Sequence, residues 1–224
     1  MSTAFARLAA RLDGYRDVVI DYQRQLTAVP ALDPSSGGDG EAKKAALVIE
    51  LLRAAGVEQI EVHEAPDPRV SAGHRPSVVA RIPGADRRRT LWVMSHLDVV
   101  PAGELRHWTA DPWTVRVEGY KIFGRGVEDN QQGIVSSLLL ARALGEEKIA
   151  LPFDLGLLFV ADEETGNTLG ISHLLEHHAV FGPQDLIVVP DGGEPYGSMI
   201  EVAEKGILWV KVTDHGKQTH GSTP

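Results

Sequence analysis

The sequence predicts an α/β protein with a mixed, mostly parallel sheet and helices on both faces. Two observations indicate this class. Continuous apolar runs typical of buried strands recur along the chain, and segments with helical spacing of apolar residues lie between them. Alternating strands and helices are the pattern of layered α/β folds. The 224 residues are enough for one or two domains.

The first part of the chain predicts mainly helix. Residues 5–25 carry apolar side chains at roughly helical spacing and predict one or two helices, and residues 30–38 predict a loop rich in Pro, Ser and Gly. Residues 39–41 then supply an acidic first turn for a helix whose apolar stripe is Val48, Leu51, Leu52 and Ala55. Gly56 is expected to end this helix.

Strands and helices alternate in the remainder. The expected strands are residues 60–63, 77–82, 91–94, 155–160 and 186–189, of which the last three are continuous apolar runs and are expected to be buried. Residues 111–123 predict an extended segment or hairpin, and residues 133–144 and 168–178 predict helices. The run Arg87-Arg88-Arg89 is expected to form a solvated turn.

The end of the chain predicts the start of a second domain. Ile207, Trp209 and Val212 suggest a new strand, and the sequence stops at Pro224 without an element to cover it. We therefore expect residues 1–204 to be the N-terminal part of one domain and residues 205–224 the truncated beginning of another.

Composition excludes several functional classes. The chain has 22 Lys and Arg against 31 Asp and Glu, a net charge of −9, so neither nucleic acid nor an anionic membrane surface is an expected partner. It has no cysteine, which excludes a disulfide scaffold and a thiolate site. No apolar run has the length of a membrane span or a signal peptide, so a cytoplasmic location is expected.

Three expected strands end in side chains that can bind metal. The strand at 91–94 runs into His96 and Asp98, the strand at 155–160 into Glu163 and Glu164, and the strand at 186–189 into Asp191. The carboxyl ends of strands are where sites assemble in open α/β sheets. A fourth candidate, Asp129, follows a glycine-rich loop just before an expected helix.

This set of side chains indicates a particular metal chemistry. Imidazole with several carboxylates and no thiolate favours Zn, Mn or Co over an iron–sulfur or copper site. The set exceeds what one catalytic zinc requires and suits two ions roughly 3.5–4 Å apart that share a carboxylate and a water. Of the neighbours Glu163 and Glu164, one can bind metal and the other can act as general base.

Four motifs in this order resemble the co-catalytic zinc metallopeptidase and amidohydrolase family. That family includes acetylornithine deacetylase, succinyl-diaminopimelate desuccinylase, aminoacylase, carnosinase-type dipeptidases and carboxypeptidases of the carboxypeptidase G type. The motifs are residues 95–101, 124–129, 162–166 and 190–192. The resemblance implies that His96 and Asp191 bind one metal, that Glu164 binds the other, and that Asp129 bridges them. It also implies a cis peptide after Asp129.

The resemblance assigns further roles. Asp98 matches the residue that holds the histidine ligand, and Glu163 matches the general base that moves a proton from the attacking water to the leaving amine. His220 resembles a lid-domain histidine that steadies the oxyanion in the site of a partner subunit. Gln132 departs from the family, which often has Lys there, and this bears on subfamily because that Lys is not a ligand.

The implied function is cleavage of an amide bond in an N-acyl-amino acid or a short peptide, with two Zn²⁺ ions, or Co or Mn, as cofactors. A dipeptidase or carboxypeptidase of the same family, or a metal-binding module without turnover, is the alternative. The family forms homodimers through the lid, and a histidine beyond the lid completes its second metal site. The sequence ends before that histidine, so we expect this chain to be a truncated hydrolase with weak or no activity.

The other histidines predict ordinary surface positions. His173 and His177 are four residues apart on an expected helix, a spacing that can bind metal, but no carboxylate motif accompanies them and a solvated helix face is favoured. His178 lies near the end of that helix, where a favourable contact with the helix dipole is expected. Four more are expected at the surface: His63, His74, His107 and His215.

Overall fold

The computed structural model describes residues 3–192, 196–203, 206, 208, 210–217 and 220–222. It divides into two units, Met1–Asp191 and Gly192–Pro224, and every helix and strand of the described residues belongs to the first. Two residues of the strand expected near the end of the chain, Ile207 and Trp209, lie outside the described residues, and Val212 is not in a strand.

The helices follow the sequence pattern closely. They are α1 (Thr3–Asp13), α2 (Arg16–Thr27), α3 (Ala42–Ala54), α4 (Gln131–Glu147) and α5 (Ile171–His177), with short 3₁₀ turns at Pro34–Ser36 and Leu105–His107. Gly56 adopts a φ of 85° after α3, and the Val57 N–H donates to the Leu52 carbonyl at 3.0 Å, which ends the helix as predicted. None of the described helices is long and apolar enough to cross a membrane.

The main sheet is mixed and has five strands. Their order is β1 (Gln59–Pro66), β2 (His74–Ile82), β6 (Phe153–Val160), β3 (Asp86–His96) and β7 (Leu186–Val188). The neighbours β6, β3 and β7 run parallel, whereas β1 and β2 add an antiparallel edge. The segment expected to be extended forms a hairpin of β4 (Arg116–Glu118) and β5 (Lys121–Phe123).

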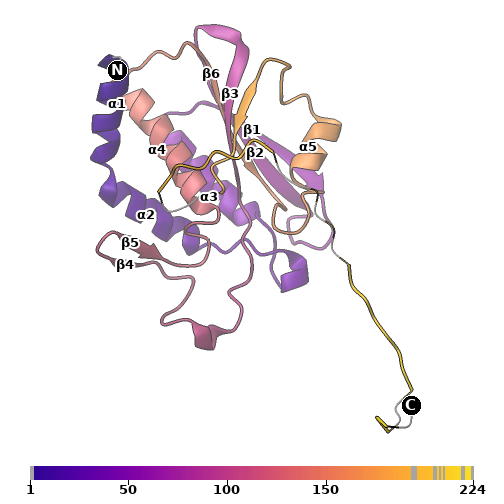
Figure 1. Ribbon diagram of the computed structural model, residues 1–224. Coiled ribbons are helices and arrows are strands. Elements are labelled where there is room, and N and C mark those ends of the chain that lie inside the picture. Colours follow the sequence, from indigo (N-terminus) through magenta and orange to yellow (C-terminus); the bar gives the residue numbers. More distant parts are fainter. Residues whose placement is uncertain are drawn as a thin grey trace. The chain divides into compact units, whose positions relative to one another are not determined.

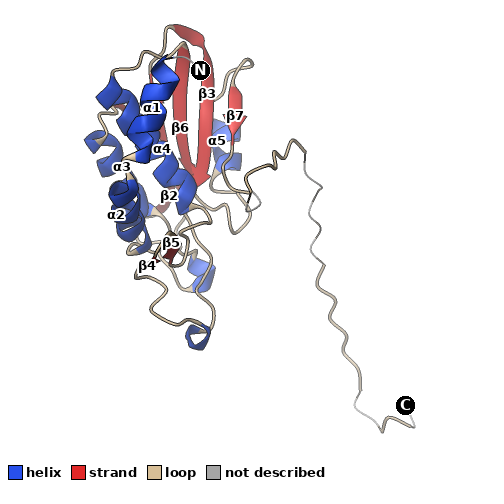
Figure 2. Ribbon diagram, turned by 60° about the vertical axis from the view of Figure 1, so that its left-hand side comes forward, coloured by secondary structure: helices blue, strands red, loops and turns tan. Residues whose placement is uncertain are grey.

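Helices cover both faces of this sheet, as the sequence predicts. Helices α1 to α4 lie on one face (Figure 1), and α5 lies on the other (Figure 2). Alternate residues of β6 pack against the helices on the two faces, because successive side chains of a strand point to opposite faces. Leu157 and Phe159 pack in the core beneath α3 and α4, and Leu158 packs with Leu174 of α5.

The arginine run is not a turn. Arg87 and Arg88 lie inside β3, where the pairing with β6 shifts register between Asp86 and Thr90. Arg87 pairs with Asp154 of β6 at 2.8 Å and Arg88 with Asp86 at 2.9 Å. The three arginines are exposed, so the solvated surface is the part of the prediction that the structure confirms.

Strand β7 has the predicted position but not the predicted burial. Leu186 is 55% exposed, Ile187 48% and Val188 50%. The reason is its place in the sheet: β7 is an edge strand and pairs with β3 alone among the described residues. Apolar composition predicted a buried strand, whereas burial depends on neighbours that the local sequence does not specify.

Candidate metal centre

The predicted metal-binding side chains come together at one edge of the sheet. His96 ends β3, Glu163 and Glu164 follow β6, and Asp191 follows β7. These three strands are parallel neighbours, so their carboxyl ends meet at the same place. Asp129 joins them from the loop before α4, and its peptide bond to Asn130 is cis, as the resemblance implied.

Two overlapping groups of ligand atoms share His96. One contains His96, Glu163 and Asp191, and the other contains His96, Asp129 and Glu164. The Nε2 atom of His96 lies 2.9 Å from Asp129 Oδ1, 3.6 Å from Asp191 Oδ2 and 3.9 Å from Glu163 Oε2. The imidazole is buried, with 1% of its side chain exposed, whereas the Asp129 side chain is 58% exposed. The cluster is therefore anchored inside and open to solvent on one side.

Asp98 holds the two halves of this cluster together. One carboxylate oxygen accepts the backbone N–H of Glu163 at 3.1 Å, and the other accepts that of Glu164 at 3.0 Å. The Nδ1 atom of His96 lies 2.9 Å from the backbone carbonyl of Asp98 and 3.5 Å from its carboxylate. An N–H on Nδ1 leaves Nε2, the nitrogen that faces the other carboxylates, free to bind a cation.

The electrostatics of the cluster favour a cation. Burial, and after it the nearby charge of Asp129, raises the pKa of Glu164 to about 7. The pKa of Glu163 is also raised, first by burial. Burial lowers the pKa of His96, but its hydrogen bond with Asp98 and the surrounding carboxylates outweigh this effect and raise it to about 9. Carboxylates held this close repel one another, and positive charge between them relieves the repulsion.

Sequence reasoning missed the residue that holds Asp191. The side-chain amide of Asn130 donates to the Asp191 carboxylate and, at 3.4 Å, to the Pro190 carbonyl. Gly133, in the first turn of α4, permits this approach, because a Cβ there would meet Ser95 Oγ at 2.5 Å and Asn130 Oδ1 at 2.6 Å. The only signal in the sequence is the place of Asn130 between Asp129 and a helix.

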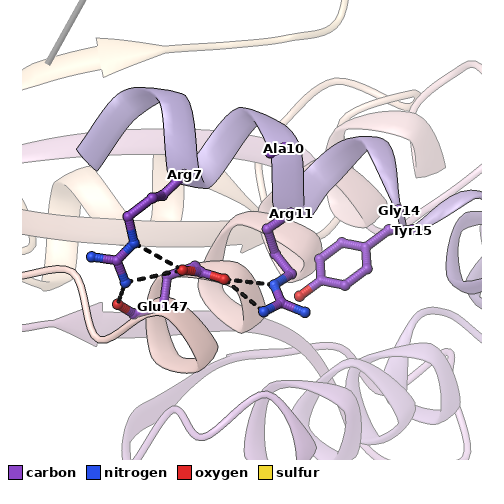
Figure 3. A pocket seen from close by; sticks show the side chains of 6 residues that line it. All are labelled: Arg7, Ala10, Arg11, Gly14, Tyr15 and Glu147. Carbon is purple, nitrogen blue, oxygen red and sulfur yellow. Dashed lines mark hydrogen bonds and ion pairs between the residues drawn. The ribbon is translucent and has the colours of Figure 1, made fainter. Parts of the chain in front are cut away.

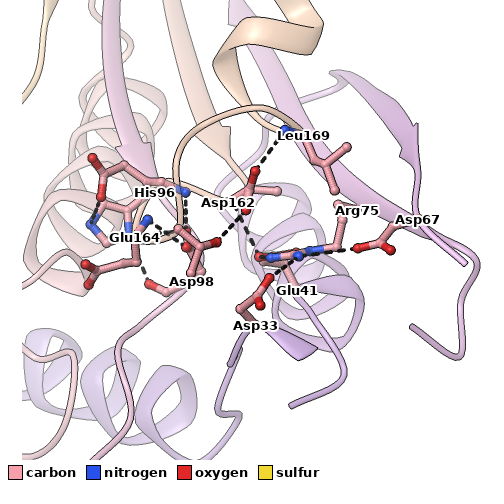
Figure 4. Close-up of polar contacts among 12 residues, drawn as sticks. Asp33, Glu41, Asp67, Arg75, His96, Asp98, Asp162, Glu164 and Leu169 are labelled. Carbon is pink, nitrogen blue, oxygen red and sulfur yellow. Dashed lines mark hydrogen bonds and ion pairs between the residues drawn. The ribbon is translucent and has the colours of Figure 1, made fainter. Parts of the chain in front are cut away.

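A buried ion cluster, also missed, supports the loop after β6 (Figure 4). Arg75 is fully buried and pairs with Glu41 and, at 2.7 Å, with Asp33. Glu41 in turn accepts the backbone N–H of Asp162 at 3.3 Å, and Asp162 accepts that of Leu169 at 2.9 Å. These contacts fix both ends of the loop that carries Glu163 and Glu164. No local pattern marks them, since their partners are far apart in the sequence.

Two features lie outside this cluster. His220 belongs to the second unit, where its Nδ1 atom lies 2.7 Å from Ser222 Oγ. A cavity of about 340 Å³ is lined by α1, Tyr15 and Glu147. Its two arginines, Arg7 and Arg11, point at Glu147 (Figure 3), with Nε–Oε distances of 3.0 and 2.8 Å, so both guanidinium groups are already engaged in ion pairs with this carboxylate.

Relatives of this chain are metallohydrolases. An uncharacterised metallohydrolase of Methanocaldococcus jannaschii is 40% identical over 92% of this chain and 51% of its own length. Succinyl-diaminopimelate desuccinylase of Wolinella succinogenes is 34% identical over 59% of this chain and 36% of its own length. The chain thus spans about half the length, or less, of the curated relatives it matches.

Solved structures have the same fold. Human carnosine dipeptidase 1 matches with a TM-score of 0.71 and 18% identity over 86% of this chain and 42% of its own. An M20 family metallo-carboxypeptidase from Sulfolobus solfataricus matches with a TM-score of 0.63 and 22% identity over 80% of this chain and 38% of its own. The model of peptidase family M20/M25/M40 matches residues 92–210. That stretch includes the strand ends and the loop from which the metal-binding groups come, and the chain belongs to this family of metallopeptidases and amidohydrolases.

Proposed function

We propose that this chain is part of a two-metal hydrolase that cleaves an amide bond in an N-acyl-amino acid or a short peptide. The observation that carries the proposal is the convergence of one buried imidazole and four carboxylates at the ends of three neighbouring strands. The relatives named as succinyl-diaminopimelate desuccinylases favour an N-acyl substrate over a dipeptide.

The residues present fit divalent metal ions. The Oε1 atom of Glu164 is buried and has no hydrogen-bond partner, which costs free energy unless a cation binds it. One imidazole with carboxylates suits Zn²⁺, and also Co²⁺ or Mn²⁺. In the proposal, His96 and Asp191 hold one ion, Glu164 holds the other, and Asp129 bridges the two.

Ions bound there would polarise the carbonyl of the scissile amide and provide a hydroxide nucleophile near neutral pH. Glu163 is the general base and then the acid that protonates the leaving amine. Its side chain is 39% exposed, so a substrate can reach it, and its raised pKa brings it closer to the pH at which proton transfer in both directions is efficient. Asp98 fixes the positions of Glu163 and His96 relative to each other through the contacts described above.

Other parts of the proposal rest on the sequence and the family resemblance. Residues 1–204 are assigned to the catalytic domain, and residues 205–224 to the start of a lid through which the full-length enzyme forms a homodimer. His220 is assigned to substrate binding in that lid. A cytoplasmic location completes the assignment.

The test is hydrolysis by the full-length protein of a panel of N-acyl-amino acids and dipeptides. We expect Glu163→Gln to abolish turnover while bound zinc, measured by elemental analysis, is retained. His96→Ala should lose the activity and the zinc that this cluster binds. If the wild-type protein retains zinc but hydrolyses nothing in the panel, and Glu163→Gln changes no measurable property, the chain is a metal-binding module without turnover.

A further inference from the structure

Four histidines gather on the face of the sheet that α5 covers, and none of them belongs to the metal-binding groups described above. His63 lies on β1, His173 and His177 lie one turn apart on α5, and His178 follows directly. The ring centres of His63 and His178 are 4.3 Å apart, those of His173 and His177 are 4.4 Å apart, and those of His173 and His178 are 5.7 Å apart. The four rings therefore form one continuous group, which we call the histidine cluster.

Packing explains why these distant residues meet. Leu174, on the same helix, is buried against β2, β3 and β6 and fastens α5 to the sheet. This brings the last turn of α5 against His63, whose side chain is only 16% exposed. The sequence predicted a surface position for His63, and the structure corrects this prediction: the ring of His178, directly after α5, packs against it and leaves it only partly exposed.

The spacing of the rings suits a shared metal ion. Two imidazoles bound to one tetrahedral Zn²⁺ ion, at Zn–N distances of about 2.0–2.1 Å, have ring centres about 5 Å apart. The three measured separations bracket this value. His173 and His177 stack face to face, whereas the rings of the other two pairs are tilted or meet edge to face. Rotation about χ2, a soft torsion in histidine, would be needed to bring the ring nitrogens toward one ion.

Two ring nitrogen atoms in the cluster have a lone pair available to bind a metal ion. His63 Nε2 is buried and has no hydrogen-bond partner, and the nearest carboxylate oxygen, on Glu61, is 3.6 Å away. His177 Nδ1 lies 3.1 Å from the backbone carbonyl of His173. An N–H at that position donates to the carbonyl and leaves the lone pair of Nε2 exposed, which is the arrangement that commonly orients metal-binding histidines.

The charge state of His63 and His173 agrees with this geometry. Burial lowers the pKa of His63 and of His173, and the neighbouring histidines lower both further. Glu61 and Glu176 oppose this shift and Arg81 adds to it. Rings that stay neutral at physiological pH keep the lone pairs that a metal ion requires.

We propose that His63, His173, His177 and His178 form a second metal site, which takes Zn²⁺ or a similar transition ion such as Ni²⁺ or Cu²⁺. The ligands are imidazoles, so Mg²⁺ and Ca²⁺ are excluded by their preference for oxygen. An ion bound there joins β1 to α5 and stabilises the layer behind the loop that carries Glu163. This inference does not depend on the proposed hydrolase activity.

The experiment is a calorimetric zinc titration at pH 7.5 of the His96→Ala variant, in which both active-site groups lose their shared ligand. We expect about one equivalent of Zn²⁺ to bind and to raise the melting temperature, with no binding of Mg²⁺. Adding His173→Gln and His177→Gln should weaken the remaining binding about tenfold or more, because two of four ligands are lost. His107→Gln, at an exposed histidine outside the cluster, is the matched control and should leave the zinc affinity unchanged.

The proposal is overturned if zinc affinity is the same with and without the His173→Gln and His177→Gln substitutions. It is also overturned if folded His96→Ala protein binds no zinc. Should His96→Ala fail to fold, the same pair of glutamine substitutions in the wild-type protein decides the question. The expected result is then the loss of one equivalent from the total zinc bound, while the remaining zinc is retained. An unchanged total would refute the site.

Discussion

At the scale of single residues, Asp98 contacts both parts of the metal cluster. Its carboxylate is buried, accepts the N–H groups of two successive residues after β6, and lies beside the ring of His96. Ligands from two different strands are thus positioned by one side chain. Residues that orient metal ligands in this way affect metal affinity although they do not touch the ion.

We therefore expect Asp98→Asn to weaken zinc binding by about 10–100-fold. The amide retains one acceptor, but its NH₂ group faces a backbone N–H, so one of the two loop hydrogen bonds is lost. The measurement is a zinc titration against a competing chelator. Asp111→Asn, at an exposed aspartate that bonds only within its own turn, should not change the affinity. Equal affinity in both variants would contradict the role given to Asp98.

Asp67, whose carboxylate lies 3.5 Å from Arg75 of the buried ion cluster, makes the stability of that cluster depend on pH. Its hydrogen bond with Arg69 is the main cause that lowers its pKa to about 2, against about 3.9 in an unfolded chain. Between these values the unfolded state binds more protons, so the contribution of Asp67 is complete above about pH 5 and is lost as the pH falls toward 2.

Asp67→Asn should accordingly reduce stability most near neutral pH and progressively less in acid. Urea unfolding of both proteins from pH 6 to pH 3 measures the difference between their free energies of unfolding. Asp17→Asn, at an almost fully exposed aspartate, serves as the control. A difference that stays constant over this range would refute the linkage.

At the scale of elements, α4 has two glycines that differ in the space available for a side chain. Gly133 faces Ser95 and Asn130, where a Cβ has no room, whereas a Cβ on Gly145 would meet only a backbone oxygen at an ordinary 3.6 Å. The first turn of α4 is thus shaped to lie against the metal cluster, and the last turn is not.

The same substitution should therefore have opposite effects at the two positions. Gly133→Ala should destabilise the protein by about 1–3 kcal/mol through overpacking, and it should weaken zinc binding because Asn130 must move. Gly145→Ala should stabilise it by about 0.5 kcal/mol through helix propensity, with zinc binding unchanged. Chemical denaturation and zinc titration of both variants test this. Equal effects at the two positions would show that the contact at Gly133 is not tight.

Element positions were largely predictable, but environments were not. Periodicity and glycine placement located all five helices and the five strands of the main sheet, because these signals are local. The exposure of β7, the strand conformation of Arg87–Arg89 and the partial burial of His63 all depend on contacts with distant segments. At the metal cluster the motif residues were predictable, whereas the supports from Asn130 and Arg75 were not.

At the scale of the whole molecule, both hydrophobic cores lie within the first unit. Neither contains a residue beyond Phe181, and the described residues from Tyr196 to Val202 are exposed. Among the described residues, the side chains that form the two cores therefore all come before Gly192.

Residues 1–191 should consequently unfold in one cooperative transition, with a melting temperature within about 2 °C of that of the 224-residue chain. Differential scanning calorimetry of the two proteins makes the comparison. A truncated protein that lacks a cooperative transition would mean that residues 192–224 contribute to the core.

The crowding of negative charge at one sheet edge also affects how fast the site fills. The five carboxylates around His96 belong to a protein with a net charge of −9, so their field extends into the solvent and draws divalent cations inward before contact. Dissolved salt shortens the reach of that field to about 8 Å at physiological ionic strength. The association rate of the first ion is therefore high at low ionic strength and lower at high ionic strength. Each ion that binds weakens the electrostatic attraction of the site for the next ion.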